Sequence, residues 1–552
     1  MRNKRFGDIL VSSGQITEEQ LNEALLEQKT TKQLLGDLLL SKGWIRERDL
    51  MDALEAQLGI PQVILYQYNL DPSVVNVITE RMAVEYLALP IKRDGNTLTV
   101  AMADPTNYYA IDNLRIYTGL QIEPVIASRS ELKTIIKRVY SIQDSVSEIM
   151  EILPKDEMND SDAQSDDSPV SRMVNHIMRN AVTVNASDVH FDPHEHSLIV
   201  RYRIDGNLQT EQVLNKSMQS IITTRIKIMS GMDISERRLP QDGRFKFDVD
   251  DRLIDVRVST LPTVNGEKMV LRILDLSSSV RVMEDLGLTS DNIKIIRSMI
   301  RRPYGLLLVS GPTGSGKTST LYAALSELNC EDVNVITIED PVEYQLRGVN
   351  QIQVNEKIGM TFLTGLRTVL RQDPNIVMVG EVRDAETVEM AIRSALTGHI
   401  VLSTIHTNDA PSTFTRLLDM GVAPYVIVSA LSGVVAQRLV RRICPDCAAE
   451  YEPTVEEQII LAQHNIRIPP KKGLGCVRCH HTGYKGRTAL YEIVVLDEEL
   501  KRLIIEQRSD SDYRKYLKST GFKSMFEDGL LKVEQGITTI TEVLSVTIGS
   551  EV

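Results

Sequence analysis

The chain has 552 residues, of which 42% are apolar and 25% are charged, and its formal net charge is −13 at pH 7. This length exceeds a single hydrophobic core and predicts roughly three to five domains. The acidic balance disfavours a surface devoted to nucleic acid, and no run of about 18 apolar residues is present that could span a bilayer. The opening MRNKRFGDIL lacks the apolar core of a signal peptide, so we expect a cytoplasmic protein.

A tandem repeat occupies residues 1–60. Residues 5–28, RFGDILVSSGQITEEQLNEALLEQ, match residues 34–57, LLGDLLLSKGWIRERDLMDALEAQ. The apolar spacing predicts two helices in each unit, and the second helix should begin near Thr17 or Arg46.

The central part of the chain changes character twice. Residues 61–140 mix helix and strand patterns, with an alternating run at Thr97–Met102, and indicate a small α+β domain. Residues 141–168 are acidic, rich in serine and poor in aromatic groups, which predicts a flexible linker.

The second half predicts two further domains. Residues 169–276 carry strand patterns at 198–204 and 254–259 and indicate another α+β domain. From 286 to 552, alternating strands and helices indicate a parallel sheet covered by helices. The predicted fold class is therefore multidomain α/β.

A phosphate-binding loop stands at the start of this last region. An apolar strand pattern at 306–310 is followed by GPTGSGKT and then by a helical pattern, the context that such a loop requires. Glycine lets backbone N–H groups surround phosphates, Lys317 can reach the β and γ oxygens, and Thr318 can offer a hydroxyl to Mg²⁺. The predicted ATP and Mg²⁺ site comprises Gly311, Pro312, Thr313, Gly314, Ser315, Gly316, Lys317, Thr318 and Ser319.

Two carboxylates follow apolar strand patterns downstream. Glu339 ends the pattern that begins at residue 333, and Glu381 comes soon after Ile376–Val379. Parallel strands would bring both groups beside the phosphate loop, where one can organise a metal ion and the other can activate water. A solvated helix-capping role is the alternative for Glu339.

Four of the five cysteines form two C-x-x-C pairs. Cys444 and Cys447, with Cys476 and Cys479, could close a tetrahedral Zn²⁺ site around a helical insert. A redox pair is the alternative, although a second pair is superfluous for dithiol chemistry. Cys330 is expected in the core.

Several motifs together resemble a known family. GPTGSGKT, ITIEDPVEY, LRQDPNIVMVGEVRD and TGHIVLSTIHTNDA, in that order, closely resemble the secretion ATPases of type II secretion and type IV pilus assembly. The resemblance extends from about residue 61 to the C-terminus. It implies a RecA-like core, a hexamer, and ATP bound between an upstream domain and the C-terminal motor domain. The tetra-cysteine insert is similar to that of assembly and export ATPases.

The resemblance also implies roles for individual residues. Glu339 would be the general base, Glu381 would organise Mg²⁺, and His399 and His406 would sense the nucleotide state. Gly380 stands where many other phosphate-loop ATPases carry Asp, which leaves the division of labour between the two glutamates open.

The upstream domain shares the family motifs SDVHFDP, RYRIDG, RLPQDGR and IDVRVSTLP. By resemblance, Arg257 and Arg272 would reach the γ-phosphate, a role that suits a permanently charged fork. Pairing with neighbouring acids on a strand surface is the alternative.

The tandem repeat resembles the cyclic di-GMP-binding domain found on a subset of these ATPases. A twofold repeat would suit a ligand with two identical halves, although Arg5 is matched by Leu34 in the second unit. A helical docking domain with leucines in its core is the alternative. The candidate ligand residues are Arg5, Asp8, Leu10, Leu21, Leu25, Gln28, Asp37, Leu39, Leu50, Leu54 and Gln57.

Together these features predict a hexameric ATPase motor for pilus assembly, regulated by cyclic di-GMP and acting through an inner-membrane platform protein. A type II secretion motor is the close alternative. A nucleic-acid translocase is disfavoured, because the chain is acidic and only 5% aromatic.

Overall fold

The structure is a computed structural model. It describes residues 6–31, 35–45, 47–65, 72–137, 139–140, 168–249, 252–275 and 281–547. Two compact units divide the chain, Met1–Ile177 and Met178–Val552. None of the described helices is both long enough and apolar enough to cross a membrane.

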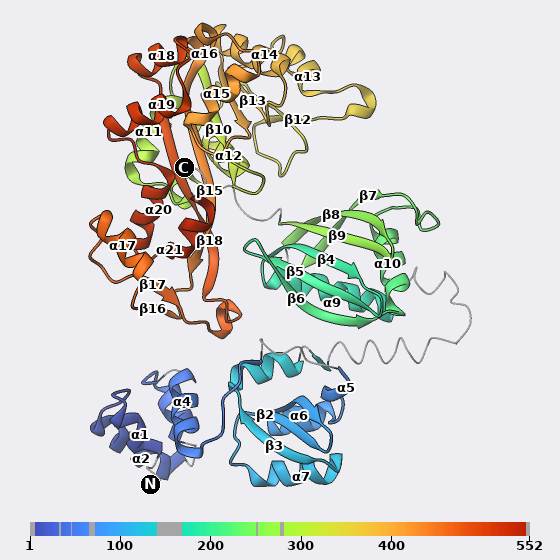
Figure 1. The fold of residues 1–552 in the computed structure, drawn as a ribbon. Helices are drawn as coiled ribbons and strands as arrows, with labels where there is room; N and C mark the ends of the chain where they lie inside the picture. The colour runs from blue at the N-terminus through green and yellow to red at the C-terminus, as the bar shows by residue number, and fades with distance from the viewer. Residues whose placement is uncertain are drawn as a thin grey trace. The chain divides into compact units, whose positions relative to one another are not determined.

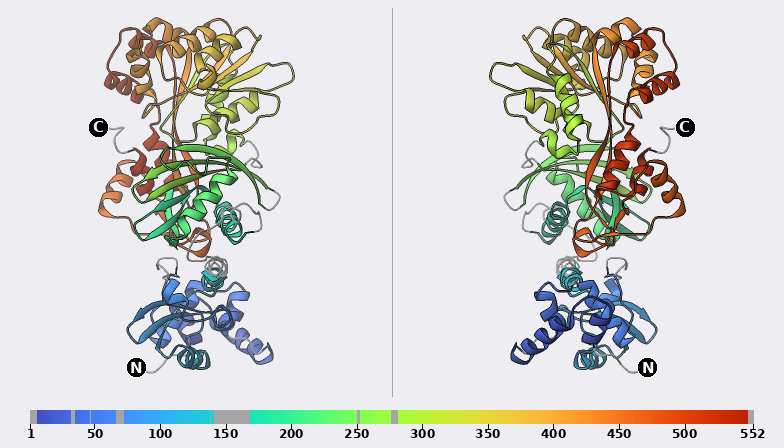
Figure 2. Two further views of the ribbon diagram at one scale, coloured as in Figure 1. Left: turned by 90° about the vertical axis from the view of Figure 1, so that its right-hand side faces the viewer. Right: turned by 90° about the vertical axis from the view of Figure 1, so that its left-hand side faces the viewer.

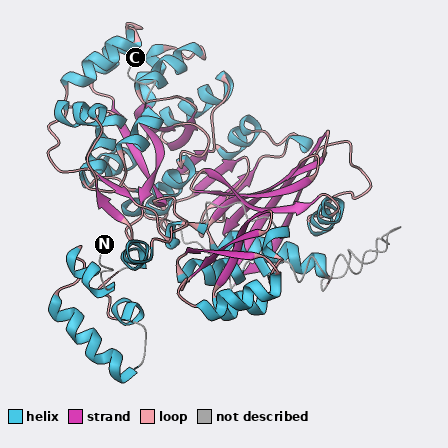
Figure 3. Ribbon diagram, turned by 60° about the horizontal axis from the view of Figure 1, so that its bottom comes forward, coloured by secondary structure: helices cyan, strands magenta, loops and turns pink. Residues whose placement is uncertain are grey.

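The described residues of the N-terminal repeat form helices joined by turns (Figure 3). Its helices are α1 (Phe6–Ser12), α2 (Glu18–Thr31), α3 (Leu35–Ser41) and α4 (Glu47–Leu58), so the prediction of two helices per unit is confirmed. Equivalent residues of the two units share one core, formed by Leu10 with Leu39, Ile16 with Ile45, and Ala24 with Ala53. Each unit therefore completes the core of the other.

The small α+β domain follows in the same unit. Its elements are α5 (Pro72–Val75), α6 (Glu80–Tyr86), β1 (Ala88–Asp94), β2 (Thr97–Met102), α7 (Tyr108–Thr118) and β3 (Gln121–Ile126). Strand β2 pairs antiparallel with β1 and parallel with β3, and it coincides with the predicted strand. The predicted linker at 141–168 lies outside the described residues except for Ser168.

The next region forms a six-stranded antiparallel sheet in the order β6-β5-β4-β9-β8-β7 (Figure 1). The elements are α9 (Pro169–Thr183), β4 (Ala186–Pro193), β5 (Ser197–Ile204), β6 (Asn207–Asn215), α10 (Met218–Met229), β7 (Gln241–Val249), β8 (Arg252–Thr263) and β9 (Gly266–Asp275). Strands β5 and β8 contain the two predicted strand patterns.

The C-terminal region contains the longest run of alternating helices and strands. Its elements are α11 (Ser290–Ile300), β10 (Gly305–Ser310), α12 (Lys317–Leu328), β11 (Val335–Glu339), β12 (Asn350–Gln353), α13 (Phe362–Val369), β13 (Ile376–Val379), α14 (Ala385–Leu396), β14 (Ile400–Ile405), α15 (Pro411–Asp419), α16 (Pro424–Ala430), β15 (Leu431–Ile443), β16 (Ala448–Glu450), α17 (Val455–Gln463), β17 (Lys471–Gly473), β18 (Tyr484–Val495), α18 (Glu498–Ile505), α19 (Asp510–Ser519), α20 (Met525–Glu534) and α21 (Ile540–Thr547).

Seven strands form one sheet in the order β12-β11-β13-β14-β10-β15-β18. All neighbouring pairs are parallel except β15 with β18. The predicted parallel sheet is confirmed, with one antiparallel edge strand added. Because β10, β11, β13 and β14 run in the same direction, the loops that follow them meet at one edge.

The sheet is covered on both faces, as Figure 2 shows. Leu306 and Leu308 belong to one core cluster, whereas Leu307 and Val309 belong to the other. Alternate residues of β10 therefore point to opposite cores, which explains why its apolar run is continuous rather than alternating.

Candidate active site

The phosphate loop connects the buried end of β10 with the first turn of α12. Gly316 is the N-cap of this helix, has a φ of 90°, and has no side chain that could accept a hydrogen bond from the helix N–H groups. A Cβ at this position would lie 3.1 Å from the Gln437 side-chain nitrogen. Glycine thus permits a left-handed turn in a crowded place and leaves helix N–H groups to meet an anion.

Lys317 is directed into this loop. Its ammonium donates to the carbonyl oxygens of Gly311, at 2.8 Å, and Pro312, at 3.0 Å. Burial lowers the pKa of Lys317, and the negative charge of Glu381 opposes that change. The ammonium therefore lies where it can reach phosphate oxygens held by the loop, with Glu381 as the nearby carboxylate.

Glu339 closes strand β11 and is 3% exposed. Its Oε1 accepts hydrogen bonds from Thr337 Oγ1 at 2.6 Å and from Gln351 Nε2 at 3.0 Å. Its Oε2 accepts a short hydrogen bond from the Tyr322 phenol. The carboxylate is therefore fixed by neutral donors rather than solvated, unlike a helix-capping group at the surface.

Glu381 follows the neighbouring strand β13. Its side chain is 13% exposed and pairs with Arg383 on one oxygen, while His406 Nε2 lies 3.4 Å from the other. Since β11 and β13 are adjacent and parallel, Glu339 and Glu381 leave the sheet at the same edge. The two carboxylates thus differ in environment, one held by neutral groups and one by cationic or titratable groups.

The structure gives a steric reason for Gly380. A Cβ at this position would lie 3.2 Å from the Ile338 carbonyl oxygen and 3.3 Å from the Glu339 Cα. Such contacts are tighter than a side chain normally makes, so an Asp here would displace the backbone that carries Glu339. The departure from the Asp-Glu pattern is therefore coupled to the position of the neighbouring carboxylate.

The two histidines of the TGHIVLSTIHTNDA motif lie at opposite ends of β14. His406 follows the strand and contacts Glu381, whereas His399 precedes it and its Nδ1 lies 2.9 Å from the Ser394 carbonyl oxygen. The parallel register with β10 places Ile405, not His399, level with Ser310. His399 therefore lies at the opposite edge of the sheet from this phosphate loop, and its role as a sensor of the nucleotide state stays a prediction.

Arg257 and Arg272 are direct partners across β8 and β9, so both side chains project from one face. Arg257 donates to the Val342 carbonyl oxygen at 2.8 Å and lies 3.2 Å from the Glu343 carboxylate. Arg272 is 60% exposed and lies 3.2 Å from Asp188. One arginine thus contacts the loop after β11, and the other has a largely exposed side chain.

A cavity of about 640 Å³, lined by both polar and apolar side chains, opens beside the first turns of α12. Its walls include Gly316 and Ser319 from that helix and its cap, Leu439 from β15 and Arg487 from β18. This position suits the sugar and base of a nucleotide whose phosphates lie on the loop.

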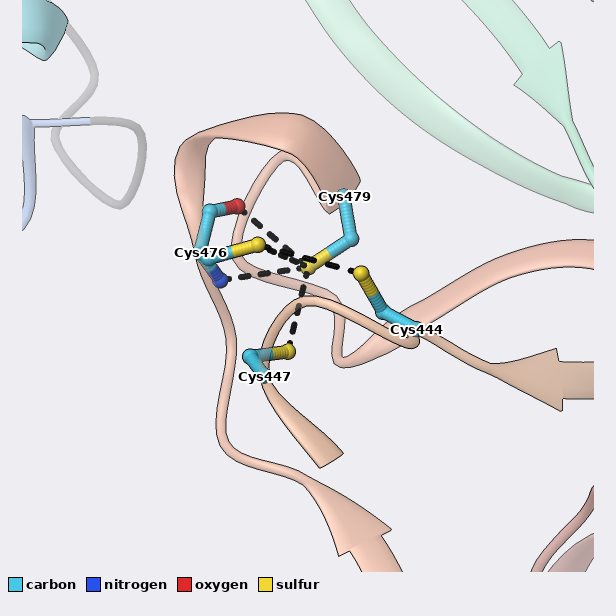
Figure 4. Close-up of side chains that lie close together, drawn as sticks. All are labelled: Cys444, Cys447, Cys476 and Cys479. Carbon is cyan, nitrogen blue, oxygen red and sulfur yellow. Dashed lines mark hydrogen bonds between the residues drawn. The ribbon is translucent and has the colours of Figure 1, made fainter. Parts of the chain in front are cut away.

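The four paired cysteines converge in space (Figure 4). Their sulfur atoms all lie within 4.8 Å of one another, and the distances Cys444–Cys476, Cys447–Cys479 and Cys476–Cys479 are 3.8, 3.8 and 3.7 Å. Four thiolates around Zn²⁺, with Zn–S bonds of about 2.3 Å, would be about 3.8 Å apart. The donor set therefore fits tetrahedral zinc. Cys330, by contrast, is exposed, which corrects its expected place in the core.

Comparisons with known proteins decide the family. The family model described as Type II/IV secretion system protein matches residues 163–545. The Type IV pilus assembly ATPase PilB of Myxococcus xanthus is 41% identical over 559 residues, which cover 98% of each chain. The chain belongs to the type II/IV secretion system protein family.

Other relatives agree with this membership. Type II secretion system protein E of Pseudomonas aeruginosa is 46% identical over 385 residues, covering 70% of this chain and 76% of that protein. The X-ray structure of the Legionella pneumophila ATPase DotB covers 68% of this chain and 96% of its own, with 22% identity and a TM-score of 0.52, and shows the shared fold. The predicted α/β class and the suspected family are confirmed.

A second family model, described as the MshEN domain, matches residues 58–146 of this chain. The match begins directly after the second repeat unit, which ends at residue 57. Leu10 and Leu39 are completely buried and belong to the core of the repeat, and their contact with a ligand stays a prediction. Leu25 is 38% exposed. Arg5 and the side chain of Asp37 lie outside the described residues.

The remaining candidates in the repeat differ in accessibility. A Cβ on Gly7 would lie 2.6 Å from Leu21, and a Cβ on Gly36 would lie 2.6 Å from Leu50. These leucines therefore pack on equivalent glycines of the two units. Asp8 is exposed, and Gln28, Leu54 and Gln57 are partly buried.

Three residues of the motor site were not predicted from the sequence. Tyr322 contacts Glu339, Arg383 contacts Glu381, and Gln437 contacts the phosphate loop. Arg383 follows Glu381 closely in the GEVRD segment, so its position beside that acid offered a signal. The sequence offered no signal for the other two residues. Tyr322 has the pattern of a core residue of an amphipathic helix, and Gln437 lies far from the loop in sequence.

Proposed function

We propose that this chain is a hexameric motor that hydrolyses ATP to drive type IV pilus assembly at the cytoplasmic face of the inner membrane. The observation that carries the proposal is the match to a pilus assembly ATPase over 98% of both chains. The phosphate loop and the two carboxylates supply the chemistry that such a motor needs.

In this proposal the chain's own groups divide the work. Backbone N–H groups of the phosphate loop and the Lys317 ammonium hold the β- and γ-phosphates. Thr318 and Glu381 would hold Mg²⁺, which neutralises phosphate charge when bound. Glu339 accepts a proton from the attacking water as the general base.

Arg257 and Arg272 would stabilise the γ-phosphate. Their shared face and the contact of Arg257 with the loop after β11 support this role. Because guanidinium stays charged and offers paired donors, it suits negative charge spread over phosphoryl oxygens.

The cysteine cluster would hold one structural Zn²⁺ in the motor domain. Four protein ligands leave no open position for a substrate, so the metal would stabilise the insert rather than take part in hydrolysis. The domain division at 1–60, 61–140, 141–168, 169–276 and 286–552 belongs to the same proposal.

The N-terminal repeat would bind cyclic di-GMP and regulate the motor. The core shared by the two repeat units supports this assignment, and the MshEN domain model matches the domain that follows the repeat, at residues 58–146. A pseudo-twofold helical unit offers similar surfaces to two identical nucleotide halves. The motor would transmit its work through an inner-membrane platform protein.

A type II secretion motor is the second candidate, favoured by 46% identity with a type II secretion protein over 385 residues. The experiment replaces the native chain with Lys317→Ala in its source organism. Loss of surface pili with normal export of secreted proteins supports pilus assembly, and the opposite outcome supports secretion.

A parallel measurement tests the chemistry. Lys317→Ala should lose nucleotide binding and turnover, whereas Glu339→Gln should bind nucleotide and lose turnover, because a base acts only in the chemical step. Near-normal hydrolysis by Glu339→Gln would show that Glu339 is not the base.

A further inference from the structure

The buried carboxylate of Glu339 has an unusual set of partners. Thr337 and Gln351 both donate to Oε1, and the Tyr322 phenol donates to Oε2. Within the described parts of the chain, no lysine, arginine or histidine forms an ion pair with it. A buried carboxylate without a cation depends on such donors to satisfy its oxygens with hydrogen bonds.

Tyr322 connects this carboxylate with the phosphate loop. It lies on α12, the helix whose first residue is Lys317, and it is completely buried. Its ring meets Tyr344 edge-on with centroids 4.6 Å apart, and Gln351 Nε2 lies 3.4 Å from its hydroxyl oxygen. Burial raises the pKa of Tyr322, so the phenol keeps its proton and remains a hydrogen-bond donor at any physiological pH.

The two carboxylate oxygens are not held equally. Oε1 has two donors from β11 and β12, whereas the contact to Oε2 comes from α12. Removing Tyr322's hydroxyl would leave the position of Oε2 to packing alone. A general base must present one oxygen to water in a fixed direction. The hydrogen bond from the Tyr322 phenol therefore affects how well the carboxylate is oriented.

We propose that Tyr322 is a positioning residue for the catalytic carboxylate. Its phenol orients Glu339 and ties that orientation to the helix that begins at the phosphate loop. The proposal rests on the proposed role of Glu339 as general base. It adds a residue that acts through Glu339 without touching the substrate.

The test compares Tyr322→Phe with Tyr344→Phe in the full chain. Tyr344 is a matched control, because it is the ring neighbour of Tyr322 and its phenol is not among the described donors to Glu339. For Tyr322→Phe we expect kcat to fall about tenfold, the typical effect of one hydrogen bond to a charged group. The KM for ATP and the affinity for a non-hydrolysable ATP analogue should change less than about twofold.

A double variant separates positioning from packing. If Tyr322 acts through Glu339, adding Tyr322→Phe to Glu339→Gln should leave the residual turnover unchanged, because the base is already absent. A purely structural effect would lower turnover in both backgrounds.

Each outcome has a distinct meaning. If Glu339→Gln is inactive but Tyr322→Phe has normal or raised kcat, the positioning proposal is overturned and the base assignment stands. If Glu339→Gln hydrolyses ATP normally, the base assignment falls and takes the proposal with it. If Tyr322→Phe fails to fold while Tyr344→Phe folds, the phenol is structural and the proposal is also overturned.

Discussion

The side-chain amide of Gln437, on strand β15, forms hydrogen bonds with the phosphate loop and with the helix that follows it. Its Nε2 donates to the Ser315 carbonyl oxygen at 2.7 Å, and its Oε1 accepts from Thr320 Oγ1 at 2.7 Å. Gln437 is 1% exposed, so both bonds are shielded from water. A Cβ on Gly311 would lie 2.5 Å from the Gln437 carbonyl oxygen, which shows how closely loop and strand approach.

Gln437→Leu should therefore weaken nucleotide binding. Leucine has similar volume but leaves a carbonyl and a hydroxyl without their partners, at a cost of about 1–3 kcal/mol each when buried. We expect the KM for ATP to rise about tenfold or more, with a smaller change in kcat. Steady-state kinetics and a thermal scan test this prediction. An unchanged KM would mean that the phosphate loop keeps its conformation without the two hydrogen bonds of Gln437.

The arginine pair gives a second prediction. Arg272→Ala should lower kcat at least about 100-fold if this side chain meets transferring phosphate, as arginine fingers do. Arg257→Ala should act similarly and also loses the contact to Val342. Arg252→Ala is the matched control, since Arg252 begins β8 and pairs with Asp275, away from Arg257 and Arg272.

Thermal scans accompany these kinetics. Arg272 is 60% exposed, so its loss should shift the unfolding midpoint little. A large drop in stability with unchanged kcat in the folded fraction would favour the surface-pairing alternative over the phosphate role.

Much of this arrangement could be predicted because it follows from local sequence. The phosphate loop, the strands that end in Glu339 and Glu381, and the paired cysteines all have short-range signals. The separation of His399 from the phosphate loop could not be predicted, because a motif gives spacing along a strand but not which end of that strand meets the loop. The burial of Leu10 and Leu39 could not be predicted, because identical leucines in a repeat suit a core as well as a ligand face.

Glu492 predicts a pH-dependent stability. It is 4% exposed and accepts from the backbone N–H groups of Ala410 and Met525. Burial, reinforced by Asp409, raises the pKa of Glu492 to about 7, although those N–H groups and Arg514 oppose the change. The folded chain thus binds this proton more tightly than the unfolded chain, whose Glu pKa is about 4.3.

The sign follows from proton linkage. Stability from Glu492 is fully present below about pH 4.3 and is lost as pH rises to about 7, a change of up to about 3–4 kcal/mol. Glu492→Gln removes this titration. The difference in unfolding midpoint, variant minus wild type, should therefore increase between pH 5 and pH 8, and a difference that is constant with pH would contradict the buried proton.

The cysteine cluster predicts about one Zn²⁺ per chain by elemental analysis. Cys444→Ser should lose the metal and lower the unfolding midpoint of the motor region, because a structural site contributes folding energy. Cys330→Ser is the control, since Cys330 is exposed and outside the cluster. Metal-free wild-type protein with the same stability as zinc-loaded protein would refute the zinc assignment.

The last prediction concerns cyclic di-GMP and the tandem repeat. Leu25 and Leu26 are both exposed on α2, at 38% and 67%, but only Leu25 has an identical counterpart, Leu54, in the second unit. A ligand with two equal halves should use the repeated position. Leu25→Ser should therefore weaken binding about tenfold, the loss expected from one apolar contact, whereas Leu26→Ser should change it less than twofold.

Calorimetry on the full chain measures this directly, with GTP as the ligand control. Both variants alter exposed side chains, so the shared core of Leu10 and Leu39 should stay intact and the thermal transitions should match wild type. Heat with cyclic di-GMP but not with GTP, reduced only by Leu25→Ser, supports a dinucleotide site on the repeat. Absence of heat at high micromolar ligand, or equal heat with GTP, would instead make the repeat a helical docking module, since the exposed leucines would then serve a protein partner.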